Sequence, residues 1–258
     1  MKTYTIGVDL GGTNIKAGLV DEAHHIVDSV SCKTNLPRPE HEVEAEIAAL
    51  CSQLAQRAGL DMAAQIESVG IGTPGSVNPH TGVVEFNANF GYRNWPLVSA
   101  MEKLLPCRVY IENDANAAAY GEYIAGAAQG AKYAIAVTLG TGIGGGIILN
   151  GKVLMGAHAA AGEVSGLVSD ISKMADDDFK LTSVERYSEA PLWAGMASAS
   201  GLIFEYARQK HLPTGSPMPT GEEIFAAYNA GEPEAQKALK IFARRVAVGI
   251  LSLQNVLD

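Results

Sequence analysis

The stretch TIGVDLGGTNIKAGLV, residues 5–20, holds the pattern from which the rest of the chain can be interpreted. Apolar residues alternate with small ones as far as Asp9 and resume after a polar turn, which predicts two short strands. Gly11 and Gly12 lack a Cβ, so the turn can take positive φ and a ligand can approach its backbone. Its N–H groups and the Thr13 hydroxyl favour an anion site. An ordinary hairpin with a glycine bulge has the same pattern.

The composition indicates a globular chain without the features of a nucleic-acid or membrane protein. The length of 258 residues is sufficient for one large or two medium domains. With 47% hydrophobic and 18% charged residues, the composition is typical of a globular protein. A net charge of −9 without a dense basic patch argues against a nucleic-acid partner. The apolar run 134–149 is too short and too rich in glycine for a membrane span.

The cysteines and the N-terminus predict a cytoplasmic protein. Cys32, Cys51 and Cys107 are odd in number and widely spaced, which is typical of thiols in a reducing compartment. Met1 lies so close to the first predicted strand that we expect no signal peptide.

The remaining pattern mixes strands and helices. The predicted strands cover 24–33, 68–72 and 108–112. The predicted helices cover 40–57, 96–105, 192–210, 222–229 and a long amphipathic segment from Pro233 onward.

Asn113 and Asp114 stand where a strand ends and an alanine-rich helix begins. Asn and Asp are preferred helix N-caps, so a capping role accounts for the pair. A carboxylate at this place also lies where strand ends meet in an α/β sheet, the usual position of a ligand crevice. Such a carboxylate can accept a proton from a hydroxyl that attacks phosphorus.

A second glycine-rich stretch, TLGTGIGGGIIL at 138–149, has the spacing G-x-G-x-x-G. A dinucleotide site would require this pattern to open a helix. Here the glycines lead into an apolar strand and the turn Asn150-Gly151, which is typical of a hairpin. The stretch therefore repeats the strand, glycine turn and strand of residues 5–20, and it suggests an internal duplication that holds one polyphosphate. Glu163 follows in a loop, where a glutamate is most often solvated.

Four motifs in this order resemble the ROK family of sugar kinases, within the actin-like ATPase superfamily. They are DLGGT with KAG at residues 9–18, GTPG at 72–75, NDAN at 113–116, and GTGIGGG at 140–146 followed by GE at 162–163. The resemblance implies two actin-like (ribonuclease H-like) α/β domains around a cleft, which we expect at 1–112 and 113–258. It also implies transfer of the γ-phosphoryl group of ATP to a hexose hydroxyl, normally on carbon 6, as in glucokinases.

The resemblance assigns roles residue by residue. Asp114 corresponds to the general base, and Asp9 to a residue near Mg²⁺, which it would hold through water. The positions that match sugar-binding residues are Gly75, Asn89, Asn113, Asp114 and Glu163. The positions that match ATP phosphate contacts are Gly11, Gly12, Thr13, Lys16, Gly140, Thr141 and Gly142. Relatives are commonly homodimers, and we expect a homodimer here.

Two departures from the family pattern concern zinc and the sugar pocket. After Glu163 the chain has Val164, Ser165 and Gly166 in place of the family's histidine, and no cysteine follows Cys107. We therefore predict no structural zinc site. Glu185 can be matched to a second sugar-binding glutamate of the family, but aligning the next helix places residues 193–194 there instead.

The chain ends before a family strand and glycine turn that pack on adenosine. We therefore expect an incomplete second domain, and the alternative function is a catalytically weak sugar-binding protein. The sequence does not distinguish glucose from N-acetylmannosamine, fructose, allose or β-glucosides.

Overall fold

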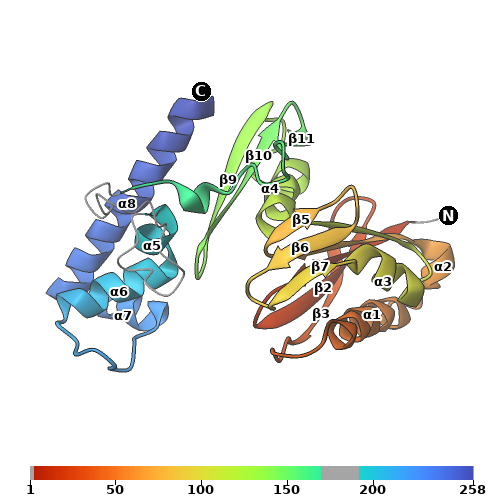
Figure 1. Ribbon diagram of the computed structural model, residues 1–258, viewed down its shortest axis with the longest axis horizontal. Coiled ribbons are helices and arrows are strands. Elements are labelled where there is room, and N and C mark those ends of the chain that lie inside the picture. The colour runs from red at the N-terminus through yellow and green to blue at the C-terminus, as the bar shows by residue number, and fades with distance from the viewer. Residues whose placement is uncertain (1–2, 170–191, 258) are drawn as a thin grey trace. The chain divides into compact units, whose positions relative to one another are not determined.

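The computed structural model describes residues 3–169 and 192–257, and the chain forms two compact units (Figure 1). Unit 1 consists of Met1–Ala134 and Gly146–Ala161, and unit 2 of Ile135–Gly145 and Gly162–Asp258. The predicted division between residues 112 and 113 follows the motifs rather than this packing, and it stays a prediction.

Unit 1 is built on a five-stranded sheet with the order β3-β2-β1-β4-β8. Its strands are β1 (Tyr4–Leu10), β2 (Asn14–Asp21), β3 (Ile26–Lys33), β4 (Ile66–Thr73) and β8 (Arg108–Asn113). The first three strands pair antiparallel, whereas β1, β4 and β8 pair parallel. This mixed sheet confirms the predicted α/β class.

Helices cover both faces of this sheet. Every second residue of β1, from Ile6 to Leu10, is buried under α1 (Glu40–Arg57) and α3 (Leu97–Leu104). Trp95 is almost completely buried in the same core and donates its indole N–H to Glu44 at 2.7 Å. On the opposite face, α4 (Asp114–Ala125) packs against β4 and β8.

Unit 1 also contains a small second sheet. It has the order β5-β6-β7, with β5 (Ser76–Asn78), β6 (Val83–Asn87) and β7 (Tyr92–Trp95). The loop from Asn87 to Tyr92 joins its last two strands. A short helix, α2 (Met62–Gln65), precedes β4.

The second glycine-rich stretch lies between two neighbouring strands, as predicted, and does not open a helix. β9 (Tyr133–Leu139) and β10 (Ile143–Leu149) flank it, and β11 (Lys152–Val153) completes the sheet. Asn150 and Gly151 form the predicted turn, both with positive φ (52° and 77°). The hairpin interpretation is therefore confirmed over a dinucleotide site.

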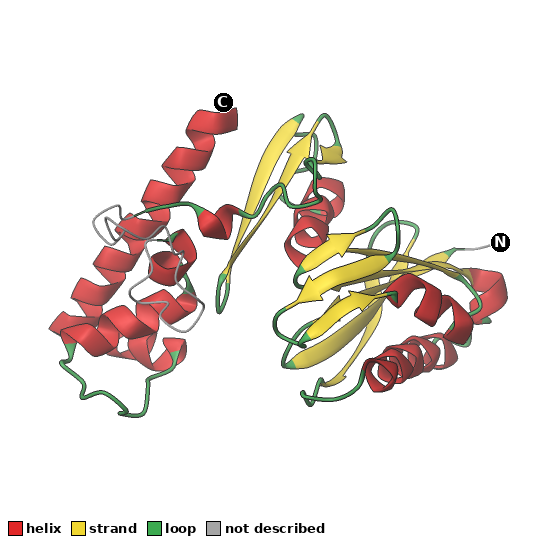
Figure 2. Cartoon of the chain, in the orientation of Figure 1, coloured by secondary structure: helices red, strands yellow, loops and turns green. Residues whose placement is uncertain are grey.

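Beyond its share of this sheet, the described part of unit 2 is mainly helical (Figure 2). The elements are η1 (Val164–Gly166), α5 (Trp193–Ala197), α6 (Ala199–Gln209), α7 (Gly221–Asn229) and α8 (Pro233–Leu257). The single helix predicted over 192–210 was wrong, because the chain leaves helical geometry at Ser198. The Ser198 hydroxyl caps α6 by accepting the Gly201 N–H at 3.2 Å.

The core of unit 2 forms around Trp193, which has no exposed surface. Its indole N–H donates to the carbonyl of Arg245 on α8 at 2.8 Å. A Cβ at Gly249 would lie 2.0 Å from the Trp193 ring, so α8 must carry a glycine there to pack this closely. None of the described helices has the length and apolarity needed to cross a bilayer.

Candidate active site

The strand register of unit 1 brings several predicted site residues to one edge of the sheet. Asp9 on β1 pairs with Gly72 on β4, and the next residue of β4, Thr73, pairs with Asn113 on β8. Because these three strands are parallel, their carboxyl ends lie side by side. In open α/β sheets this edge is where ligands bind.

The first glycine turn is held by its own chain. Gly11 donates its N–H to the Asn14 carbonyl at 3.0 Å, and a Cβ at Gly11 would lie 2.9 Å from that oxygen. Thr34, which is fully buried, donates its hydroxyl to the Gly11 carbonyl at 2.6 Å and its N–H to the Thr13 carbonyl at 3.0 Å. Thr34 was not predicted to support the turn, because in the sequence it is only a threonine that follows a predicted strand.

Asp9 and Lys16 flank this turn with opposite charges. The Lys16 ammonium lies 3.8 Å from the Asp9 carboxylate, and both side chains are largely exposed. Oxygen ligands suit Mg²⁺, which usually keeps several waters and binds one or two carboxylates together with substrate phosphates. Asp9 fits that role. Among the described residues no group of three His, Cys, Asp or Glu side chains is placed to hold a metal. The predicted lack of zinc stays a prediction.

Asn113 caps α4, so the capping interpretation is correct. Its side-chain oxygen accepts the N–H groups of Ala115 at 3.0 Å and Asn116 at 3.2 Å. Its amide nitrogen donates to the Gly75 carbonyl at 3.2 Å. The same side chain thus fixes the start of the helix and the turn that follows β4, and it places Asp114 at the first position of α4.

The pKa of the Asp114 carboxyl is raised above the ordinary value of an aspartate. Asp114 is exposed, but the protein atoms near its carboxylate desolvate it in part, and this desolvation is the main cause of the raised pKa. The hydrogen bond from the Ala115 N–H acts in the opposite direction, and the negative charge of Asp9 raises the pKa further. A raised pKa makes a carboxylate a stronger base once it is ionised.

Gly75 and Asn89 lie on the segments that border this edge. Gly75 has a φ of 102°, and a Cβ there would lie 2.2 Å from the Phe86 carbonyl oxygen, so only glycine fits. Asn89 is exposed, and its Cβ is 3.8 Å from where a Cβ of Gly12 would be. Unit 1 therefore brings Asp9, the first glycine turn and the predicted sugar-binding residues other than Glu163 into one neighbourhood.

The remaining predicted residues belong to unit 2. Gly140 donates its N–H to the Gly142 carbonyl at 3.0 Å and accepts the Ala199 N–H at 2.9 Å, which ties this turn to the start of α6. Glu163 is exposed and directly precedes η1.

Close packing holds the Glu163 turn against β10. A Cβ at Gly145 would lie 2.6 Å from the Val164 side chain and 2.7 Å from the Gly162 carbonyl. This contact connects the second glycine stretch to the Gly-Glu motif. Glu185, the open match for a second sugar-binding glutamate, lies outside the described residues.

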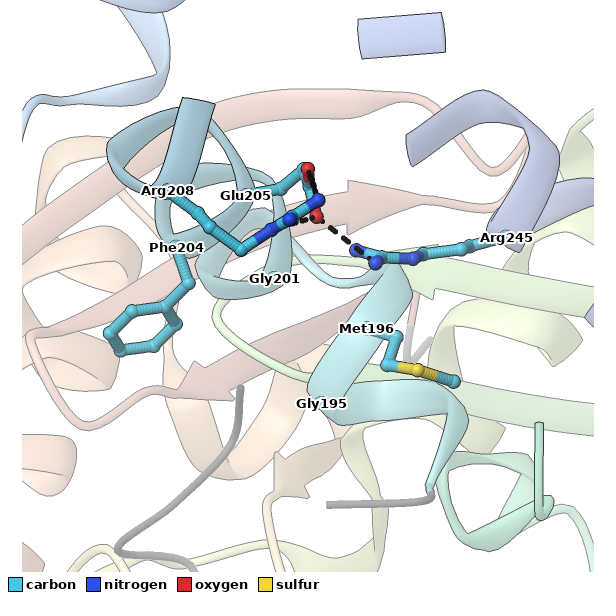
Figure 3. Close-up of a pocket in the computed structure, with 7 residues that line it drawn as sticks. All are labelled: Gly195, Met196, Gly201, Phe204, Glu205, Arg208 and Arg245. Atoms are coloured by element: carbon cyan, nitrogen blue, oxygen red, sulfur yellow. Dashed lines mark hydrogen bonds and ion pairs between the residues drawn. The ribbon is translucent and has the colours of Figure 1, made fainter. Parts of the chain in front are cut away.

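Unit 2 also contains a cavity of about 270 Å³ that borders a buried carboxylate (Figure 3). Glu205 on α6 is almost completely buried, and its two oxygens meet Arg208 at 2.6 Å and Arg245 at 3.0 Å. Burial opposes ionisation of Glu205, but the hydrogen bonds from Arg208 and Gln209, together with the positive charges of Arg245 and Arg208, outweigh it, and the pKa of Glu205 is lowered. A stably ionised, doubly paired carboxylate is suited to joining α6 to α8 rather than to proton transfer.

Comparisons with known proteins agree with the motifs. The ROK family model matches residues 5–258. A glucokinase of Streptomyces coelicolor is 34% identical over 98% of this chain and 78% of its own, and one of Halalkalibacterium halodurans is 38% identical over 99% and 77%. The structure of a ROK family glucokinase from Streptomyces griseus, in complex with glucose and AMPPNP, superposes with a TM-score of 0.78 at 32% identity, over 98% of this chain and 80% of that one. The chain belongs to the ROK family, and it lies among the sugar kinases of that family.

Proposed function

We propose that this protein transfers the γ-phosphoryl group of ATP to a hydroxyl of a hexose, the one on carbon 6, with glucose as the first candidate substrate. The observation that carries the proposal is the set of groups at the carboxyl edge of the unit 1 sheet. A carboxylate of raised pKa, Asp114, lies there with the Gly11–Thr13 turn and the amide side chains of Asn89 and Asn113.

The proposed chemistry is a single displacement. The sugar hydroxyl gives its proton to the Asp114 carboxylate while its oxygen forms a bond to the γ-phosphorus. The bond from that phosphorus to the β,γ-bridging oxygen breaks, and ADP leaves with the electron pair. Phosphoryl transfer needs positioning and charge neutralisation more than covalent help from the protein.

The other residues then have positioning roles. Asn89, Asn113, Gly75 and Glu163 bind sugar hydroxyls, and the turns Gly11–Thr13 and Gly140–Gly142 bind the phosphates, with Lys16 nearby. Mg²⁺, when bound with ATP, neutralises part of the phosphate charge, and Asp9 holds it through water.

The raised pKa of Asp114 supports its role as the base, because an ordinary aspartate is a weak base near neutral pH. The exposed carboxylate of Asp9 is accessible to a hydrated cation. The homodimer, the cytoplasmic location and the absence of nucleic-acid and membrane partners stay predictions.

A coupled assay of ADP release tests the proposal directly. The protein is given Mg·ATP with each member of a panel of hexoses, amino sugars and β-glucosides, and the position of the phosphate in the product is determined. We expect turnover with glucose or a close relative and phosphate on carbon 6.

Two results would contradict the proposal. Turnover with a phosphate at another position would refute the carbon 6 assignment. No turnover with any sugar, while one of them still raises the melting temperature, would favour the alternative, a sugar-binding protein with weak or no catalysis.

A further inference from the structure

Asn87 is a buried polar residue that the proposed mechanism does not use. It ends β6 and has no exposed surface. An amide in such a place is costly unless its hydrogen bonds are made. The hydrogen bonds of the Asn87 side chain therefore indicate its structural role.

The Asn87 side chain joins two segments that are distant from each other in the sequence. Its oxygen accepts the N–H groups of Asn89 at 3.0 Å and Phe90 at 3.2 Å. Its nitrogen donates to the Pro74 carbonyl at 2.8 Å, with a longer contact of 3.4 Å to the Thr73 hydroxyl. One amide thus holds the loop after β6 and the turn after β4 at a fixed separation.

Both segments carry residues of the proposed sugar site. Gly75 follows Pro74 directly, and its carbonyl accepts the Asn113 amide, next to Asp114 in the chain. Asn89 donates its own backbone N–H to the Asn87 side chain, so Asn87 constrains the backbone from which the Asn89 side chain projects. The connection therefore runs from Asn89 through Asn87 and the Pro74-Gly75 turn to Asn113.

We propose that Asn87 is a positioning residue for the sugar, which sets the spacing between Asn89 and the Asn113-Asp114 pair. This inference depends on the proposed sugar kinase function. Asn87 itself does not touch the substrate. Buried side chains with all their hydrogen bonds made give a rigid frame to the residues that bind a ligand, and small misplacements in such a frame reduce rates severely.

Asn78 provides a matched control in the same small sheet. Its side-chain oxygen also accepts two backbone N–H groups, from His80 at 3.2 Å and Thr81 at 3.3 Å, and its nitrogen donates to Glu85 at 3.4 Å. Asn78 pairs with Val83, at the start of β6, whereas Asn87 ends that strand. Its loop carries none of the proposed site residues.

The test compares Asn87→Ala, Asn87→Asp and Asn78→Ala with the unmodified protein, well below their melting temperatures. For each, KM for the sugar, KM for ATP and kcat are measured, and the dissociation constant of the sugar is measured by calorimetry. We expect Asn87→Ala to raise KM and the dissociation constant for the sugar about tenfold or more, with little change in KM for ATP. Asn78→Ala should leave the sugar constants unchanged.

Asn87→Asp keeps the acceptor for Asn89 and Phe90 but loses the donor to Pro74 unless the new carboxyl is protonated. We therefore expect its sugar affinity to improve as the pH is lowered, relative to the unmodified protein at each pH. This variant also serves if Asn87→Ala does not fold. A residue needed only for stability would lower the active fraction, and hence kcat, without this recovery.

The outcomes separate the two proposals. An unmodified protein that binds the sugar, together with Asn87 variants that bind it equally well, would overturn the positioning role alone. An unmodified protein that neither binds nor phosphorylates any sugar would overturn the proposed function and the positioning role with it.

Discussion

The two glycine turns have similar sequences but are held in different ways. In the first, Gly11 is required by the chain itself, because a Cβ there would lie 2.9 Å from the Asn14 carbonyl, and Thr34 supports the turn from behind with two hydrogen bonds. In the second, Cβ atoms at Gly140 and Gly142 would meet nothing within 4 Å, and neither residue has positive φ.

This difference separates two reasons for a glycine. Gly11 is explained by local geometry alone, whereas folding of the described residues gives no reason for Gly140 and Gly142. Within a turn proposed to bind phosphate, a glycine that the fold itself does not need leaves room for a ligand to approach the backbone. If both turns bind phosphate as proposed, Gly140 and Gly142 serve the ligand alone, whereas Gly11 is also needed for the conformation of its own turn.

The largest effect is expected from replacing Asp114, which follows β8 at the sheet edge where the first glycine turn also lies. We expect Asp114→Asn to lower kcat by about 10²- to 10⁴-fold, because a positioned base typically contributes that much. Sugar binding, measured by calorimetry, should change little because the amide keeps the shape and one hydrogen-bonding oxygen.

The same variant should gain stability at neutral pH. A carboxylate whose pKa is raised by folding destabilises the folded state once it is ionised, so this penalty grows as the pH rises from 3.8 through the raised value. Asparagine removes the penalty, and the melting temperature at pH 7 should rise. Loss of sugar binding in this variant would show that Asp114 is not only a base.

Two alanine substitutions, one in each glycine turn, test the comparison of the turns directly, and their expected effects are smaller. Gly140→Ala should raise KM for ATP about tenfold, equivalent to about 1.4 kcal/mol, while the free energy of unfolding changes by less than about 0.5 kcal/mol. Gly11→Ala should instead lower the free energy of unfolding by about 1–3 kcal/mol, because the turn is overpacked.

Gly221→Ala is the control for these two. Gly221 lies at the start of α7, has open space around its Cβ position and no positive φ, and belongs to the same unit as Gly140. It should leave KM for ATP unchanged. If Gly140→Ala were to behave like Gly221→Ala, the second turn would not be a phosphate site.

The smallest effect concerns pH. Because the pKa of Asp114 is raised, the acid limb of kcat/KM should lie above the pH expected of an ordinary aspartate. The charge of Asp9 is one cause of the increase, so Asp9→Asn should shift this limb to lower pH, with saturating Mg²⁺ in both profiles. An acid limb that stays in place would mean that Asp9 does not act on the base.

The sequence predicted those elements whose pattern is local. The alternation around Ile6 and the helical spacing after Glu40 reproduce β1 and α1, and Asn150-Gly151 forms the turn that its residue types require. The break at Ser198 was missed, because the apolar spacing continues across it and only the cap contact to Gly201 reveals it.

The supporting residues of the site were not predictable in this way. Thr34 and Asn87 act through contacts with residues 23 and 13 positions away, and neither belongs to a recognisable motif. Such roles depend on which turns and loops the fold brings together, and neither residue type nor local spacing records that. The motif residues could be named from the sequence, whereas the residues that hold them in place required the fold.

The placement of the two tryptophans has a practical consequence. The chain contains only two, and Trp95 is buried in the core of unit 1 while Trp193 is buried in that of unit 2. Each unit thus carries its own intrinsic fluorophore, shielded from water in the folded state. With Trp95→Phe or Trp193→Phe, the emission of a single indole would report the denaturation of one unit, so that nucleotide and sugar could each be assigned to the unit that they protect.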